Sequence, residues 1–280
     1  MPAHTRNTSL IELTGPDRAL VRPLFEAAPA NAHGFLFSVL EGNHAGRIFV
    51  DNAAAPTAAM ASLACEFNFL VGDAGNTAFA RAVQQLFLTD LTPPPAPWGQ
   101  MLFLMPLSRA WHADILRRYG SYRIDDIARR VFTFDAGRFA VRHGDWRARL
   151  PRGFTLRLYD RALAESAEGL AEFWSGIDNF LANGFGYALT RGSEVAGRCH
   201  TVLCGAGEAE ISIETAEAYR RQGLATLTAC AFIEHALHKG MQPAWSCWFN
   251  NDASIALAGD LGFVSAPDMP VCVVVLDSTS

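Results

Sequence analysis

The sequence predicts a mixed α/β fold, with a mixed sheet, in which one order of elements occurs twice. Strand-like and helix-like patterns alternate in both halves, in the order strands, helix, strand, helix, strand. A polar and basic stretch at 142–152 separates the two patterned regions. The 280 residues, 50% of them apolar, provide enough core material for two domains. We therefore predict domains at residues 1–145 and 146–280.

In the first half, apolar runs alternate with segments of helical periodicity. The Pro-rich segment 92–97 cannot continue a helix and predicts a loop. The expected elements are a helix at 16–28, strands at 34–40, 47–51 and 59–71, a helix at 76–90, a strand at 101–107, a helix at 110–119 and a strand at 131–134.

In the second half, short apolar stretches precede a long apolar helix. Gly240, followed by Pro243, predicts a left-handed stop for that helix. The expected elements are a strand at 154–158, helical material at 162–181, strands at 186–190, 197–203 and 208–215, a helix at 224–239 and a strand at 245–249.

The joint at 215–225, between a strand and the long helix, carries the pattern Arg-x-x-Gly-x-Ala. The first N–H groups of a helix have no internal acceptor, and the helix dipole adds positive charge there. Arg220 and Arg221 add two cations, although cations oppose the dipole at this end of a helix. Gly223 lets the backbone approach a ligand. These features predict an anion site in a chain whose formal charge is -5.

The stretch 219–225 resembles the pyrophosphate loop of the GCN5-related N-acetyltransferases (GNAT), written Arg/Gln-x-x-Gly-x-Gly/Ala. A second block follows, with Asn251, Ser254 and a Leu-Gly-Phe at 261–263, and it resembles motif B of that family. Together they cover about residues 150–280. The approach to the loop, Glu-Ile-x-Ile-x-Thr at 210–215, together with the later Pro-x-Trp-x-Cys at 243–247, is similar to a two-domain branch that includes self-resistance enzymes of the zwittermicin type.

The resemblance implies a GNAT fold in the C-terminal half and acetyl-CoA as co-substrate. In the family, a backbone N–H at the end of the strand before the loop holds the thioester oxygen, here near Ile213 and Thr215. Motif B residues contact the pantetheine arm. The residues implied to bind the cofactor are Ile213, Thr215, Arg220, Arg221, Gln222, Gly223, Leu224, Ala225, Thr226, Asn251 and Ser254. Asn251 and Ser254 are equally explained as a helix cap and first turn.

The expected reaction transfers an acetyl group to a primary amine, directly within a ternary complex. An alkyl amine has a pKa of about 10, so a base or a water chain must remove its proton. The family often uses a Glu near the strand end. Glu214 is the first candidate and Glu210 the second, and strand alternation places both on one face.

One position departs from the family pattern. The family often has a general-acid Tyr four residues after the motif B Ala/Ser, where this chain has Ala258. Cys247, Ser254 and water are the alternative proton sources. A thiol pKa of about 8.5 also allows the thiolate to leave unprotonated.

In the first half, the position of the phosphate loop is taken by Gly-Asp-Ala-Gly-Asn at 72–76. Asp73 would repel phosphate. We therefore expect a degenerate GNAT-like N-terminal domain without catalysis.

Several classes are not expected. The apolar runs are far shorter than the roughly 20 residues of a membrane span, and the N-terminus lacks a signal-peptide core. The expectation is a cytoplasmic protein, a monomer or homodimer. The cysteines lack zinc-site spacing, and no basic face suggests nucleic acid, so neither a metal nor a nucleic-acid partner is predicted.

The acceptor is expected to be a small-molecule amine. Acidic residues of the first half would favour a cationic polyamine or an aminoglycoside-like substrate, although solvated faces explain them too. Two alternatives stay open: a catalytically weak sensor or pseudoenzyme that binds CoA or acyl-CoA, and a structural interaction module.

Overall fold

The computed structural model describes residues 10–63, 67–91, 93 and 99–279 and divides into two compact units. Unit 1 comprises residues up to Gly42, Gly46–Ala128 and the C-terminal segment from Met269. Unit 2 comprises Asn43–Ala45 and Arg129–Asp268. Among the described residues, no helix combines the length and apolarity that crossing a membrane requires.

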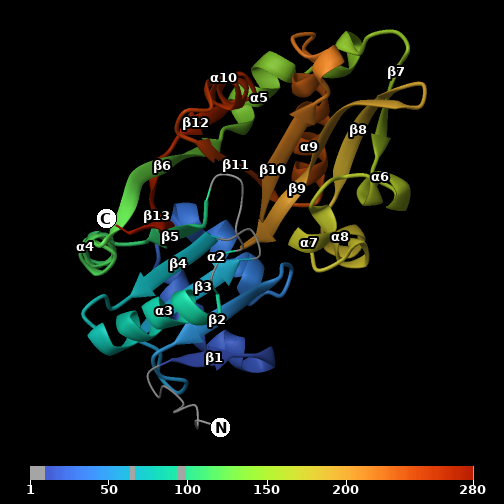
Figure 1. Ribbon diagram of the computed structural model, residues 1–280. Coiled ribbons are helices and arrows are strands. Elements are labelled where there is room, and N and C mark those ends of the chain that lie inside the picture. Colours follow the sequence, from blue (N-terminus) through green and yellow to red (C-terminus); the bar gives the residue numbers. More distant parts are fainter. Residues whose placement is uncertain (1–9, 64–66, 92, 94–98, 280) are drawn as a thin grey trace. The chain divides into compact units, whose positions relative to one another are not determined.

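Unit 1 is a mixed sheet with the strand order β1-β2-β3-β4-β5-β13 (Figure 1). Strands β1 to β4 are antiparallel neighbours, β4 and β5 are parallel across helix α3, and β13 runs antiparallel to β5. The core, with Trp111, Phe79 and Leu104, involves α3, α4 and the sheet. The elements are β1 (Ile11–Leu13), a 3-10 helix (Gly15–Val21), α1 (Arg22–Glu26), a 3-10 helix (Ala30–Ala32), α2 (His33–Leu40), β2 (Gly46–Val50), β3 (Ala58–Leu63), β4 (Phe67–Gly72), α3 (Thr77–Thr89), β5 (Met101–Pro106), α4 (Arg109–Arg118) and β13 (Met269–Thr279).

Unit 2 repeats this plan with the order β7-β8-β9-β10-β11-β6, and β12 pairs with β6. Strands β7 to β10 are antiparallel, and β10 and β11 are parallel across helix α9. The elements are β6 (Tyr122–Phe134), α5 (Ala136–His143), a 3-10 helix (Trp146–Arg149), β7 (Phe154–Leu158), α6 (Arg161–Glu165), α7 (Leu170–Phe173), α8 (Ile177–Asn183), β8 (Gly186–Arg191), β9 (Glu194–Gly205), β10 (Glu208–Thr215), a 3-10 helix η4 (Glu217–Tyr219), α9 (Leu224–His238), β11 (Gln242–Trp248), α10 (Asp252–Asp260) and β12 (Phe263–Ser265).

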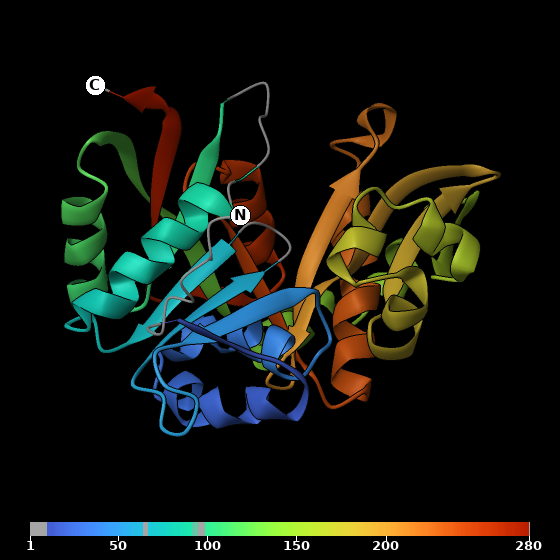
Figure 2. The same ribbon diagram turned by 60° about the horizontal axis from the view of Figure 1, so that its bottom comes forward.

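Helices cover both faces of the unit 2 sheet (Figure 2). Helix α9 packs on one face, where Phe232 stacks on Phe185 with ring centroids 4.6 Å apart. Helices α6 to α8 enclose a separate cluster around Trp174 and Phe180 on the other face. Gly240 ends α9 with a φ of 71°, the predicted left-handed stop.

Each unit takes a strand from the other half of the sequence. Strand β6 is divided between the units after Ala128, and in unit 2 its residues 129–132 pair with β11 and 132–134 with β12. Strand β13, the segment from Met269, pairs with β5 in unit 1. The linker stretch also belongs to unit 2, because Trp146 is buried and its Nε1 donates to Glu234 of α9 at 2.7 Å. The division at 145/146 stays a prediction, and the compact units follow these contacts instead.

Two element predictions in the first half are wrong. Residues 34–40 form helix α2, in which the consecutive residues 35–39 are all buried. A short run that is apolar on every side has no period that separates a strand from a buried helix. The single strand predicted at 59–71 is two strands, β3 and β4, which pair antiparallel and are each mostly buried.

The strand predicted at 131–134 is the end of β6, which begins at Tyr122. Its first part mixes charged and apolar residues without regular alternation and is partly exposed, so it carries neither an apolar run nor a period of two. The loop predicted at 92–97 lies outside the described residues except for Pro93.

Candidate functional site

The site of interest begins where β10 and β11 separate. Their parallel pairing extends from Glu208 opposite Gln242 to Glu210 opposite Ala244. Beyond this point β10 continues to Thr215 beside β9, and β11 continues to Trp248 beside β6. In the described pairings, the β11-facing edge of 211–215 therefore has no strand partner. This is the edge where the family resemblance places the oxyanion donor, near Ile213 and Thr215.

The predicted phosphate loop joins β10 to α9 through η4 and a left-handed turn. Arg221 has a φ of 58° and Gly223, the residue before the helix, a φ of 77°. A Cβ on Gly223 would meet no atom within 4 Å, so glycine serves the backbone conformation and the space beside it is open.

The loop presents its charges and helix terminus outward. No side chain caps the N-terminus of α9. Arg220 and Arg221 are exposed, and Arg220 Nε donates to Thr215 O at 3.2 Å, which ties the loop to the end of β10. Gln222 donates to Ala218 O, while Leu224 is buried and Ala225 and Thr226 are half-buried. The arrangement suits an anion at the helix terminus.

Glu210 lies in a buried polar cluster between β10, β11 and β6. Its Oε1 accepts a hydrogen bond from Ser246 Oγ at 2.6 Å, and Ser246 Oγ accepts one from Arg129 Nη2 at 2.8 Å. Burial raises the pKa of the Glu210 carboxyl, although the Ser246 hydrogen bond and the Arg129 charge partly offset that effect. A buried carboxyl with a raised pKa suits proton transfer near neutral pH.

Glu214 has different surroundings. Its side chain is 68% exposed, and Oε1 lies 3.1 Å from Nε of Arg198 on β9. Arg198 also donates to Leu163 O and Ser166 Oγ, and so links the strand to α6 and the residue after it. The two carboxylates leave β10 on one face, as predicted, but Glu210 reaches β11 and Glu214 reaches β9. Only Glu210 is withdrawn from solvent.

The motif B residues have structural partners. Asn251 caps α10 by accepting from Ser254 N at 3.1 Å, and Ser254 Oγ accepts from Trp245 Nε1 at 3.0 Å. Ala258, at the position of the family's Tyr, is fully buried. Burial raises the pKa of the Cys247 thiol, which makes it a poorer proton donor to a departing thiolate.

Sequence reasoning missed Arg129 and Ser246. Arg129 lies in the part of β6 that lacks an apolar pattern and in the half assigned to the other domain. Ser246 is a small polar residue inside an apolar strand, two residues before Trp248. A polar residue within a buried strand is the one signal that pointed to it.

Unit 1 holds one group of metal-type side chains among the described residues, formed by His112, Asp126 and the buried Cys272. His112 Nε2 lies 3.0 Å from Asp126, which already provides it with a partner. The predicted absence of a metal stays a prediction. In unit 2, Cys199 and Cys204 belong to different apolar clusters.

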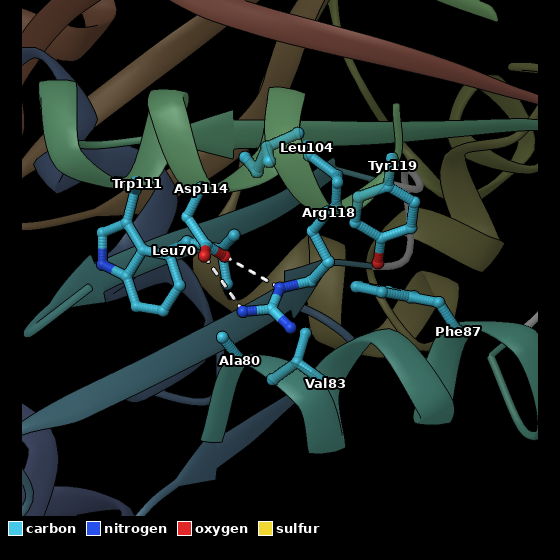
Figure 3. A pocket seen from close by; sticks show the side chains of 10 residues that line it. Leu70, Ala80, Val83, Phe87, Leu104, Trp111, Asp114, Arg118 and Tyr119 are labelled. Atoms are coloured by element: carbon cyan, nitrogen blue, oxygen red, sulfur yellow. Dashed lines mark hydrogen bonds and ion pairs between the residues drawn. The ribbon is translucent and has the colours of Figure 1, made fainter. Parts of the chain in front are cut away.

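Unit 1 also contains a small cavity between α3 and α4 (Figure 3). Its volume of about 10 Å³ is near the lower limit for one water molecule. Asp114 accepts from Nε and Nη2 of Arg118 at 2.9 Å, and both side chains lie beside Trp111 and Tyr119. The pair is satisfied within the unit, and the cavity is too small for a cofactor.

The fold and the loop define an acyltransferase of the GNAT class. The sequence model described as GNAT acetyltransferase matches residues 22–271, and the chain belongs to this family. It is a GNAT N-acetyltransferase.

Relatives of similar length support this assignment. The chain is 26% identical over 242 residues to the uncharacterized N-acetyltransferase YdfB of Bacillus subtilis, covering 85% of this chain and 88% of the relative. A GCN5-related N-acetyltransferase-like protein of Streptococcus suis has 25% identity and a TM-score of 0.68, over 92% of this chain and 98% of that one. A tandem GNAT protein from the clavulanic acid biosynthesis pathway, 15% identical, has a TM-score of 0.60 over 94% and 97%, a likeness of fold alone.

Proposed function

We propose that this protein transfers the acetyl group of acetyl-CoA to a primary amine of a small molecule, within a ternary complex in unit 2. The observation that carries the proposal is the uncapped N-terminus of α9, preceded by the left-handed Gly223 and two exposed arginines, next to the point where β10 and β11 separate. Family membership implies acetyl-CoA as the donor.

Phosphate binding follows from the local electrostatics. The pyrophosphate of CoA would accept from the first N–H groups of α9 and lie near Arg220 and Arg221. The pantetheine arm would follow the free edge of β10, near Ile213 and Thr215. Asn251 and Ser254 already have hydrogen-bond partners, so their proposed contact with this arm would use the donors and acceptors of these side chains that those bonds leave unused.

The acyl transfer needs a base and an oxyanion donor. The amine nitrogen forms a bond to the acetyl carbon, the carbon–sulfur bond breaks, and the proton leaves the nitrogen toward a base. Glu210 is the better base because its carboxyl is buried and not neutralised by a direct ion pair, whereas Glu214 is paired with Arg198. A backbone N–H at the end of β10 would stabilise the oxyanion. The CoA thiolate then takes its proton from solvent; an alkyl thiol such as that of cysteine has a pKa of about 8.5, so a thiolate can leave without a general acid.

Unit 1 is proposed to be a degenerate GNAT-like unit that binds no CoA. It has the same strand and helix order, but its own side chains occupy the N-terminus of α3. Its proposed role is that of a substrate or scaffold domain. Membership of the zwittermicin-type branch is also a proposal. The acidic residues of the first half would favour a cationic polyamine or an aminoglycoside-like acceptor.

The test is calorimetric titration of the purified protein with acetyl-CoA. We expect a saturable site that weakens strongly in Arg220→Glu. Absence of binding to the wild-type protein removes the proposal. Arg152→Glu, which changes the charge of another arginine in unit 2, is the matched control.

A second function is favoured by one observation, the buried Ala258 in place of a general-acid Tyr. The protein would then be a CoA or acyl-CoA sensor. Thiol release measured with spermidine, kanamycin and tyramine separates the two, because a sensor binds acetyl-CoA and releases no CoA with any amine.

A further inference from the structure

Arg129 belongs to the first half of the sequence, yet its partners are residues of unit 2. In the antiparallel pairing of β6 with β11 it lies opposite Trp248. Its guanidinium carbon is 4.9 Å from the centroid of the Trp248 ring, within the range of a cation–π contact. The side chain is therefore held on the sheet face that carries Glu210.

The hydrogen bonds from Arg129 to Glu210 have a fixed direction. A serine hydroxyl has one proton to donate, and Ser246 directs it to Glu210 Oε1 at 2.6 Å. Arginine has only donors, so Ser246 Oγ must accept from Arg129 Nη2, at 2.8 Å. Arg129 thus fixes the orientation of the Ser246 hydroxyl, and that hydroxyl in turn holds the Glu210 carboxylate.

The charge of Arg129 also acts on Glu210. Glu210 is buried, and burial favours the neutral form of its carboxyl. Arg129 supplies the opposing positive charge among the described residues, and the Cys247 thiol of β11 is the other titratable group that senses this carboxyl. Arg130, the next residue, pairs with Asp268 at 2.9 Å.

We propose that Arg129 is a positioning residue of the acetyl transfer, which holds Glu210 through Ser246 and keeps the carboxylate ionised as the base. The proposal rests on the proposed function of unit 2. It follows that the first half contributes to the reaction even if unit 1 binds no cofactor, because β6 carries this residue into the catalytic unit.

The first test needs no turnover. In protein labelled with ¹³C at the Glu side-chain carboxyl, the Glu210 signal is assigned by its loss in Glu210→Gln, and its titration is followed in each variant. In Arg129→Gln, which keeps a donor but loses the charge, the midpoint is expected to rise by about one pH unit. Arg129→Lys should restore most of the difference, and Arg130→Gln should leave the midpoint unchanged. An unchanged midpoint in Arg129→Gln, with the fold intact by circular dichroism, overturns the proposal.

The second test uses the pH profile of kcat/KM with spermidine, kanamycin or tyramine, whichever is acetylated. The base must be ionised, so activity rises with pH through its pKa. Arg129→Gln should move this acidic limb upward by about one unit, a tenfold loss on the limb that higher pH recovers. Equal loss at every pH indicates a structural role and overturns the proposal.

Acetyl-CoA binding keeps the two proposals apart. Calorimetry should give the same acetyl-CoA affinity for Arg129→Gln and the wild type, since the phosphate loop is untouched. If the wild type does not bind acetyl-CoA, the proposed function fails. A rise in the titration midpoint of Glu210 would then support only the electrostatic coupling between Arg129 and Glu210. The role of Glu210 as the base would be lost with the proposed function.

Discussion

Helices α3 and α9 hold the same place in their units, each following one strand and preceding its parallel neighbour, but their N-termini differ. At α3, Asn76 accepts from Phe79 N at 3.0 Å and Asp73 accepts from Gly75 N at 2.8 Å. Asn76 is itself held by Asp51 at 3.0 Å. At α9, Gly223 offers no capping side chain, and the cations Arg221 and Arg220 lie two and three positions before it. The same topology therefore does not give the same binding capacity. Side chains accept hydrogen bonds at the N-terminus of α3, whereas the N-terminus of α9 is left for a ligand.

The largest expected effect comes from giving α9 the kind of terminus that α3 has. Gly223→Asp places a carboxylate at the first N–H groups of the helix, where it competes with phosphate and repels it. Acetyl-CoA affinity should fall by about a thousandfold, or about 4 kcal/mol, by calorimetry. Asp73→Asn in unit 1 is the control and should leave affinity unchanged. A loss smaller than tenfold would show that phosphate binds elsewhere.

The next largest effect is expected from low pH, which should destabilise unit 2 more than unit 1. His44 and His200 are buried in unit 2, and desolvation lowers the pKa of each to about 4. His44 Nδ1 donates to Phe173 O and Nε2 accepts from Cys204 N, so protonation removes an acceptor. Because the folded pKa lies below the unfolded one, stability is full above about pH 6.5 and is lost as pH falls toward 4, by up to about 3 kcal/mol for each histidine.

Hydrogen exchange at pH 7 and 4.5, corrected for the intrinsic rate, measures this difference. Unit 2 should lose protection before unit 1. His44→Gln should lessen the acid sensitivity, whereas His112→Asn in unit 1 should not. If unit 1 lost protection first, the buried histidines of unit 2 would not be the main cause of acid sensitivity.

A smaller effect is expected at Arg221, whose positive φ is uncommon for a non-glycine residue. Arg221→Gly relieves the backbone and removes a cation. Acetyl-CoA affinity should fall about tenfold and less so in high salt, while stability rises by about 1 kcal/mol in urea unfolding. Ala206→Gly, at a φ of 53°, should stabilise without changing affinity. A stable Arg221→Gly protein with full affinity would exclude this arginine from phosphate binding.

The smallest effect concerns the caps. Asn76→Ala should cost about 1 kcal/mol of stability and leave acetyl-CoA affinity unchanged. Asn251→Ala, which removes the cap of α10, should cost a similar amount. Comparing their affinities by calorimetry decides whether Asn251 also contacts the pantetheine arm, because only that contact lowers affinity beyond the Asn76→Ala control.

The sequence predicted the elements around the loop because their signals are local. Strand 208–215, the start of the helix at Leu224 and its stop at Gly240 depend on alternation, periodicity and glycine conformation. Helix α2 was missed because complete burial removes periodicity. The exchange of β6 and β13 was missed because pairing between distant strands leaves no mark in either one.

The site was predicted in part for the same reason. Alternation along β10 indicated that Glu210 and Glu214 share a face. It could not show which one is buried, since that depends on Ser246 and Arg129 for one carboxylate and on Arg198 for the other. These partners come from strands that lie between 16 and 81 positions away in sequence.

The exchanged strand β13 has a consequence for biosynthesis. Strand β5 of unit 1 is translated more than 160 residues before the segment at Met269–Thr279 that pairs with it. Pairing between strands so distant in sequence slows folding. Until β13 is available, the exposed edge of β5 can pair with a strand of another chain. Unit 1 therefore reaches its final form only after residues 269–279 have left the ribosome, and chaperones that shield strand edges should raise the yield of native protein.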